Sequence, residues 1–355
     1  MHYKSFDARV AKNRSAVILA GGDGLRLRSF VQRLRGDGLP KQYVKFFGKH
    51  SLLEATLQRA RALVPSKRQF VVVTENHFDY AEVPKQLSNY PEVHVASQPM
   101  NRDTGLGLLL PLAHIYKTRP DSTVVVFPSD HFIEEEMLFL NHVDAAFALV
   151  ERDSEKIVLL AIAPTHAETE YGYILPSNCR HNELPFGARE VKGFIEKPDP
   201  ETARKLVQRG GFWNTMVMVF KLRAFLEQLR AINPLAYTCF EQISNAVETT
   251  GLSDVVSQVF TNSEPFNLSK GFLEKIAAQK PRSILVLPVR GVQWSDWGSE
   301  ERIMKTVELT KGDRLGFEST GGYSASLLKQ SIACKSTYLD ASLKTRPNPL
   351  GDVTA

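Results

Sequence analysis

The stretch "AVILAGGDGLRLR" (residues 16–28) decides the fold, because an apolar run leads directly into a glycine-rich turn and two arginines. A strand that ends in glycines brings backbone N–H groups close together, and such a turn attracts anions. The stretch lacks the third glycine of G-x-G-x-x-G, since Leu27 stands there, and it lacks the G-K-[ST] of a P-loop. A turn followed by Arg26 and Arg28 instead suits a long phosphate chain. A purely structural turn stays open from this stretch alone.

Four more short apolar runs follow, and they are typical of strands buried on both faces in a parallel sheet. They read "QFVVVTE" from Gln69, "VHVASQP" from Val93, "STVVVFPSD" from Ser122 and "KIVLLAIAP" from Lys156. Helical patterns lie between them: "SLLEATLQRARALV", with Ser51 and Glu54 as a capping box, "GLGLLLPLAHIYK", and residues 138–150. This alternation predicts an α/β fold with a Rossmann-like, doubly wound mixed sheet.

The rhythm changes after residue 164, where "EYGYILPS", "VKGFIEKPD" and "GFWNTMVMVFK" are expected to be added strands over one side of the active site. From Thr310 no strand or helix periodicity is visible, and Gly, Ser, Thr and Lys are frequent. We therefore predict a catalytic domain over residues 1–305 and a short C-terminal extension over 306–355 that is partly disordered.

Composition narrows the class of protein. The hydrophobic share of 43% and the charged share of 23% are ordinary for a globular chain, and the net charge of +5 is scattered. A small polyanionic substrate explains that charge, and no nucleic-acid-binding signature accompanies it. Three distant cysteines, with no visible signal peptide or membrane span, predict a cytoplasmic protein without a membrane partner. The oligomeric state stays open, with a homodimer as one option.

Two acids follow apolar runs in similar positions. Asp130 stands in "FPSDHFI" at the end of the fourth run, and Asp296 stands in "VQWSDWGSE" after "SILVLPVRGV". Open α/β sheets bind ligands at the carboxyl ends of their strands, and Mg²⁺ prefers one or two carboxylates together with phosphate oxygens. A Mg²⁺ site is therefore expected here. The alternative for Asp130 is a cap on the following helix.

The motifs occur in an order that resembles a known family. They are "LAGGDGLRLR", "LPKQYVKFFGKHSLLEATLQR", "SQPMNRDTGLGLLL", "VVVFPSDHFI", "PTHAETEYGYI", "GFIEKPD", "FWNTMVMVF" and "WSDWGS". Together they resemble the bacterial mannose-1-phosphate guanylyltransferases, within the sugar-phosphate nucleotidyltransferases. The resemblance implies a Rossmann-like sheet, Mg²⁺, and two small-molecule substrates, a nucleoside triphosphate (here GTP) and a sugar 1-phosphate (here mannose 1-phosphate). The products would be a nucleotide sugar and pyrophosphate.

The resemblance also implies roles for individual residues. The phosphate and metal roles fall on Gly21, Gly22 and Gly24 around the triphosphate, Arg26 on the leaving pyrophosphate, Lys41 on the nucleotide, Lys197 on the sugar phosphate, and Asp130 and Asp296 on Mg²⁺. The recognition roles fall on Gln98 and Thr104 for the base and on Gly172, Glu196 and Asn214 for the sugar hydroxyls. The alternatives are surface solvation for the two lysines and a buried strand-end amide for Asn214.

The chain departs from the family pattern at several points. It reads "RLRSFVQRLRGDGLPKQ" where R-L-W-P is usual, and Glu300 replaces a tryptophan. Thr215 and Met216 stand where a serine and a glycine follow W-N, and the methionine is expected to narrow the sugar pocket. In "NLSKGFLEK" the acid and aromatic positions of the family hold Ser269 and Lys270 instead.

Three other functions compete with this hypothesis. One is a relative that uses another base or hexose 1-phosphate, and another is a non-catalytic protein that binds a nucleotide or a nucleotide sugar. The departures at Met216 and in "NLSKGFLE" keep the second alternative open. The third, a nicotinamide-dependent oxidoreductase, is disfavoured, because the third glycine is missing and only Glu75 is a candidate for reading the ribose.

Overall fold

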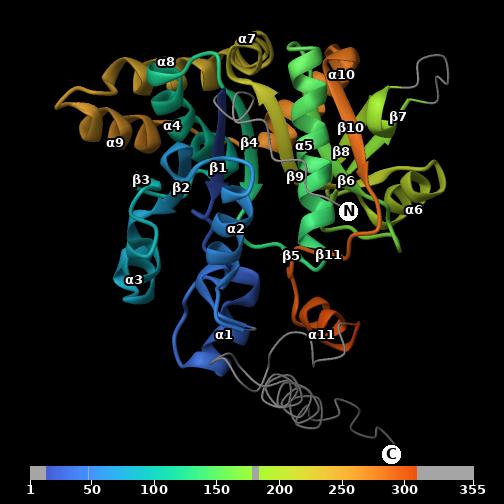
Figure 1. The fold of residues 1–355 in the computed structure, drawn as a ribbon, viewed down its shortest axis with the longest axis horizontal. Coiled ribbons are helices and arrows are strands. Elements are labelled where there is room, and N and C mark those ends of the chain that lie inside the picture. The colour runs from blue at the N-terminus through green and yellow to red at the C-terminus, as the bar shows by residue number, and fades with distance from the viewer. Residues whose placement is uncertain (1–12, 47, 178–183, 310–355) are drawn as a thin grey trace, which may run out of the picture. The chain divides into compact units, whose positions relative to one another are not determined.

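The computed structural model describes residues 13–46, 48–177 and 184–309 (Figure 1). Within these ranges the chain forms two units, one of residues 13–23 and 52–296 and the other of residues 24–51 and 297–309. The chain passes from one unit to the other directly after Asp23 and directly after Asp296, so both changes fall within motifs of the predicted site.

The larger unit contains a nine-stranded sheet in the order β3-β2-β1-β4-β9-β6-β10-β8-β7. Its strands are β1 (Arg14–Leu19), β2 (Gln69–Thr74), β3 (His94–Gln98), β4 (Thr123–Pro128), β6 (Ile157–Ile162), β7 (Gly172–Pro176), β8 (Arg189–Glu196), β9 (Phe212–Lys221) and β10 (Ile284–Val289). The parallel pairs are β1 with β2 and β4, β2 with β3, and β6 with β10. The five predicted apolar strands are confirmed, and the chain leaves β1 on one side and returns through β4 on the other.

The three turn-rich strands join this same sheet and do not form a separate cover. β9 runs antiparallel between β4 and β6, while β7 and β8 pair antiparallel at the sheet edge. β9 fits the middle of the sheet because residues 217–220 are buried on both faces. The sheet is therefore mixed, as predicted. The predicted site residues on β7, β8 and β9 belong to this same sheet.

Helices cover both faces of the sheet, as a doubly wound fold requires. They are α2 (Leu52–Arg61), α3 (Glu82–Ser88), α4 (Asp103–Thr118), α5 (Glu136–Arg152), α6 (Pro200–Gln208), α7 (Leu222–Ile232), α8 (Pro234–Ala246), α9 (Leu252–Asn262) and α10 (Glu274–Gln279). In Figure 1, α5 lies in front of the sheet and α4 behind it, and α4 shares one large apolar core with α7, α8 and α10. The predicted helices over residues 51–64, 105–117 and 138–150 correspond to α2, α4 and α5.

The smaller unit contains α1 (Arg28–Arg35) and α11 (Glu300–Leu309). Arg33 forms a 2.9 Å ion pair with Glu300, and the ring of Phe46 packs edge-on against Trp297 with a 5.5 Å centroid separation. The stretch that departs from R-L-W-P is thus a helix, and it pairs with the other departure, Glu300. The predicted domain boundary at 305/306 falls inside α11, and residues 310–355 lie outside the described part of the chain.

Two sequence expectations concern cysteines and membranes. Cys239 is a half-buried free thiol, whereas Cys179 and Cys334 lie outside the described residues. Among the helices that the structure describes, none combines the length and the apolar character needed to cross a bilayer.

Candidate active site

The end of β1 is tied to the end of β4 at the point where the strand order reverses. The backbone N–H of Ser129 donates to the Leu19 carbonyl at 3.1 Å, and the Ser129 hydroxyl donates to the same oxygen at 2.7 Å. Gly21 and Gly22 follow directly, and the space around Gly22 is open. In open α/β sheets this switch point is where ligands bind. The glycine turn and Asp130 therefore emerge at the same edge of the sheet.

Gln98, at the end of β3, lies against the glycine turn. A Cβ on Gly21 would lie 2.6 Å from Gln98 Nε2, so only glycine fits without a shift. Gln98 Nε2 donates to Thr74 Oγ1 at 2.8 Å, and that hydroxyl donates to the Gly21 carbonyl at 2.8 Å. Gln98 Oε1 has no hydrogen-bond partner among the described residues. The amide is therefore fixed with its carbonyl oxygen buried and unpaired, on the side of Gly107 in α4.

Asp23 joins three loops, and sequence reasoning gave it no role. Asn101 Nδ2 donates to Asp23 Oδ2 at 2.9 Å, and His77 Nε2 lies 3.5 Å from Asp23 Oδ1. Burial lowers the pKa of the His77 imidazole, and the charge of Asp23 acts in the opposite direction. These contacts connect the loops that follow β1, β2 and β3.

Thr104, predicted to read the base, lies in the first turn of α4. Its hydroxyl contacts Asp103 Oδ1 at 3.2 Å and accepts the Leu268 N–H at 3.3 Å. Asn267 also donates to the Asp103 carboxylate, at 3.1 Å and 3.2 Å. These bonds fix the start of α4 against the segment that leads into Ser269. The predicted base contact of Thr104 remains a prediction.

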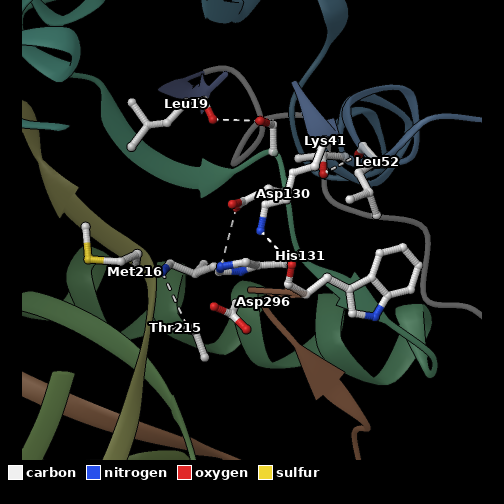
Figure 2. A network of polar contacts seen from close by, with 12 residues as sticks. Leu19, Lys41, Leu52, Asp130, His131, Thr215, Met216 and Asp296 are labelled. Carbon is white, nitrogen blue, oxygen red and sulfur yellow. Dashed lines mark hydrogen bonds and ion pairs between the residues drawn. The ribbon is translucent and has the colours of Figure 1, made fainter. Parts of the chain in front are cut away.

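Asp130 and Asp296 are brought together by two short strands, β5 (Phe132–Ile133) and β11 (Trp294–Ser295). These pair antiparallel, with Ser295 opposite Phe132. Continuing the register by one residue sets Asp296 opposite His131, next to Asp130 in the chain, and Figure 2 shows the three side chains gathered here. Because α5 begins six residues after Asp130, the alternative of a helix cap is wrong.

His131 lies between polar partners beside these acids. Its Nε2 is 3.7 Å from Asp130 Oδ1, and Trp294 Nε1 donates to His131 Nδ1 at 3.2 Å. Since an indole N–H only donates, Nδ1 is the acceptor, and Nε2 is the ring nitrogen that faces Asp130. His131 therefore lies between Trp294 and the Asp130 carboxylate. In the sequence, only the position of His131 directly after Asp130 could have indicated this contact.

Tyr171 connects the second acid to the predicted sugar-phosphate lysine. Its hydroxyl donates to Asp296 Oδ1 at 2.8 Å, and its carbonyl accepts the Lys197 N–H at 3.2 Å. The ring packs against Trp213 and Trp294 at centroid separations of 5.1 Å and 5.4 Å. Lys197 is exposed and has a positive φ of 47°, which turns it out of β8. One run of contacts thus joins the main chain of Lys197 to Asp296.

The donor set at this point fits a hard cation that keeps open positions. Within the described ranges, no group of three or more His, Cys, Asp or Glu side chains is arranged to hold a metal ion. Two carboxylates on neighbouring segments are what Mg²⁺ takes when phosphate oxygens and water complete its shell. The arrangement therefore suits a metal that arrives with a phosphorylated substrate better than a permanent structural metal.

The predicted sugar residues Gly172 and Glu196 face one another across β7 and β8. A Cβ on Gly172 would lie 2.5 Å from Glu196 Oε2, so the glycine leaves room for this carboxylate. Burial raises the pKa of Glu196, and the nearby Glu274 carboxylate acts in the same direction. A hydrogen bond from Ser269 and the charge of Lys197 act to lower it.

Asn214 completes this sugar-side group through Met216. The Met216 N–H donates to Asn214 Oδ1 at 3.1 Å, and Asn214 Nδ2 and Ser269 Oγ point to the Met216 sulfur at 3.1 Å and 3.3 Å. Ser269 opens a π-helical turn (Ser269–Leu273), a feature common at functional sites. Met216, which departs from the family pattern, is thus in contact with Asn214, which matches it, and with Ser269, a second departure.

The remaining predicted residues belong to the smaller unit. Gly24 has a φ of 61°, which favours glycine, and a Cβ there would lie 3.2 Å from the Lys41 nitrogen. Lys41 Nζ donates to the Trp297 carbonyl at 3.2 Å, so this lysine is engaged within its own unit rather than merely solvated. Arg26 is exposed in the turn Leu25–Leu27. The phosphate contacts of Arg26 and Lys41 stay predictions.

A sequence model of the nucleotidyl transferase family matches residues 15–311, which include every predicted site residue. The chain belongs to the nucleotidyl transferase family. The resemblance of the motifs is thereby confirmed at the family level, as is the Rossmann-like fold.

Individual relatives of this nucleotidyl transferase carry more specific names. It is 29% identical to mannose-1-phosphate guanylyltransferase 2 of Escherichia coli O157:H7, over 87% of this chain and 64% of the relative. It is 30% identical to the xanthan biosynthesis protein XanB of Xanthomonas campestris, over 82% of this chain and 59% of the relative. The chain thus spans less than two thirds of these relatives.

The fold of this nucleotidyl transferase is similar to that of a solved structure. The crystal structure of mannose-1-phosphate geranyltransferase from Thermus thermophilus matches with a TM-score of 0.67 and 25% identity. The match covers 81% of this chain and 76% of the other. The chain therefore shares most of its fold with this solved structure.

Proposed function

We propose that this chain transfers a nucleoside monophosphate from a nucleoside triphosphate to a sugar 1-phosphate and releases pyrophosphate, with GTP and mannose 1-phosphate as substrates. One observation carries the proposal: the pairing of β5 with β11 sets Asp296 beside Asp130, and Tyr171 links Asp296 to Lys197. The names of the relatives support the choice of GTP and mannose 1-phosphate.

The reaction needs positioning and charge neutralisation more than covalent chemistry. A phosphate oxygen of the sugar 1-phosphate attacks the α-phosphorus in line, the bond to the β-phosphate breaks, and pyrophosphate leaves. The backbone N–H groups of the glycine turn bind the triphosphate, and the Lys197 ammonium holds the attacking phosphate. Asp130 and Asp296 would hold Mg²⁺, which supplies positive charge to the reacting phosphates.

Base recognition is assigned to the carbonyl oxygen of Gln98. Thr74 fixes the amide so that Oε1 is the acceptor without a protein partner among the described residues. Guanine offers the N1–H and N2–H groups that such an acceptor takes. A base that presents no N–H group at this position would leave the buried acceptor unpaired and would bind more weakly.

A grid of substrates tests the proposal. Pyrophosphate release is measured with Mg²⁺ for GTP, ATP, UTP, CTP and dTTP, each with mannose, glucose and galactose 1-phosphate. We expect the highest kcat/KM for GTP with mannose 1-phosphate, and GDP-mannose as the second product. Another pair with the highest value would correct the substrates. Nucleotide binding by thermal shift, with no turnover on any pair, would refute the enzyme and favour the non-catalytic binding protein.

A further inference from the structure

Met216 occupies an unusual place in the sheet. Its φ is 58°, in the left-handed region that a methionine rarely adopts. Residues 215–217 of β9 lie between two ladder pairs, Asn214 with Ala161 and Met218 with Leu159, that only Leu160 separates on β6. The strand therefore bulges outward at this position. Strained backbone of this kind persists where the surrounding structure holds it, often at ligand sites.

The bulge leaves Met216 partly exposed. From Trp213 to Phe220 every residue of β9 is buried except Met216, which is half-buried. Met216 is therefore the residue of this stretch with the most exposed surface, and the rest of it packs against the large apolar core. The contacts of Met216 with Asn214 and Ser269 place it in the sugar-side group.

The methionine also engages the polar groups around it. Both polar atoms of the Asn214 side chain bond to Met216, one to its N–H and one to its sulfur. The Ser269 hydroxyl points to the same sulfur. A thioether is only a weak acceptor, and a sugar hydroxyl buried against it would lose its bonds to water without an equal replacement.

We propose that Met216 is a specificity-determining residue that selects a sugar 1-phosphate with a C–H group in place of a hydroxyl at the point facing β9, that is, a monodeoxyhexose 1-phosphate. This inference rests on the proposed function and refines its sugar. Mannose 1-phosphate is then the parent compound of the preferred substrate, used less well than one of its deoxy analogues.

The experiment compares mannose 1-phosphate with its 2-, 3-, 4- and 6-deoxy analogues, with GTP and Mg²⁺. We expect the wild-type chain to use one analogue with a kcat/KM about tenfold or more above the parent, the scale of one mismatched hydroxyl. Met216→Gly, which suits the positive φ and frees Asn214 and Ser269, should reverse that order. Met216→Leu is the matched control: it keeps the bulk without the sulfur and should keep the wild-type order.

A second readout does not depend on turnover. Met216→Gly should hold or raise the melting temperature because glycine relieves the backbone, whereas Met218→Ala, two residues along in regular strand, should lower it. An equal drop in both variants would make Met216 a packing residue and overturn the inference. So would a wild-type preference for the parent over every analogue. Absence of turnover with all five sugars in every variant would instead refute the proposed function, and the inference with it.

Discussion

The Glu196 carboxyl group shows, at the scale of one residue, how the predicted site works against stability. Burial and the nearby Glu274 raise its pKa, and a Ser269 hydrogen bond with the charges of Lys197 and Lys270 only partly offsets them. The folded chain therefore holds this proton to higher pH than the unfolded chain does. Wherever it is ionised, Glu196 therefore costs stability, which is typical of residues kept for function.

Glu196→Gln should accordingly stabilise the protein in a pH-dependent way. A raised carboxyl pKa means that stability is lost as pH rises from the ordinary glutamate pKa through the folded one, so the variant gains over wild type above that window and not below it. Melting temperatures at about pH 4 and about pH 7.5 measure this, and the gain should appear only at the higher pH. In a Glu274→Gln background the gain should shrink, because one cause of the shift is gone. A gain of the same size at both pH values would contradict the account.

The two-residue strands β5 and β11 carry the predicted chemistry at the scale of elements. Their ladder, together with the Trp294 bond to His131 and the Tyr171 bond to Asp296, fixes the acids within one polar network. Strands this short have no periodicity to read, so the sequence indicated both acids without the pairing that brings them together. The same holds for the bulge at Met216 and the π-helical turn at Ser269, which depend on contacts between distant segments.

Tyr171→Phe tests this network. The ring and its aromatic neighbours stay, while Asp296 loses a hydroxyl donor, a hydrogen bond to a charged group that is worth about tenfold or more in kcat. The Mg²⁺ concentration for half-maximal rate should rise as well. Tyr173→Phe, two residues further on in β7, is the matched control, because its hydroxyl accepts the N–H of Glu168 rather than bonding to either acid. A wild-type rate and metal requirement in Tyr171→Phe would remove Tyr171 from the site.

At the scale of the whole molecule, the sequence predicted the parallel half of the sheet well. Runs apolar on both faces, such as residues 69–74 and 123–128, fit only buried strands, and the structure confirms them. The place of β9 between β4 and β6 was not predictable, because an antiparallel insertion leaves the same apolar pattern as a parallel one. The passage between units after Asp23 and Asp296 was also missed, since no linker composition marks either point.

The central claim is that Asp130 and Asp296 form the reactive centre, and turnover of two isosteric variants tests it most directly. Steady-state kcat with Mg²⁺ is measured for Asp130→Asn and Asp296→Asn on the best pair of the grid. The control is Asp121→Asn, an exposed aspartate paired with Arg223. Each site variant should lose about 100-fold or more, with a nearly unchanged melting temperature, because charge is removed where the phosphates react. The control should keep the wild-type rate, and a wild-type rate in either site variant would contradict the account.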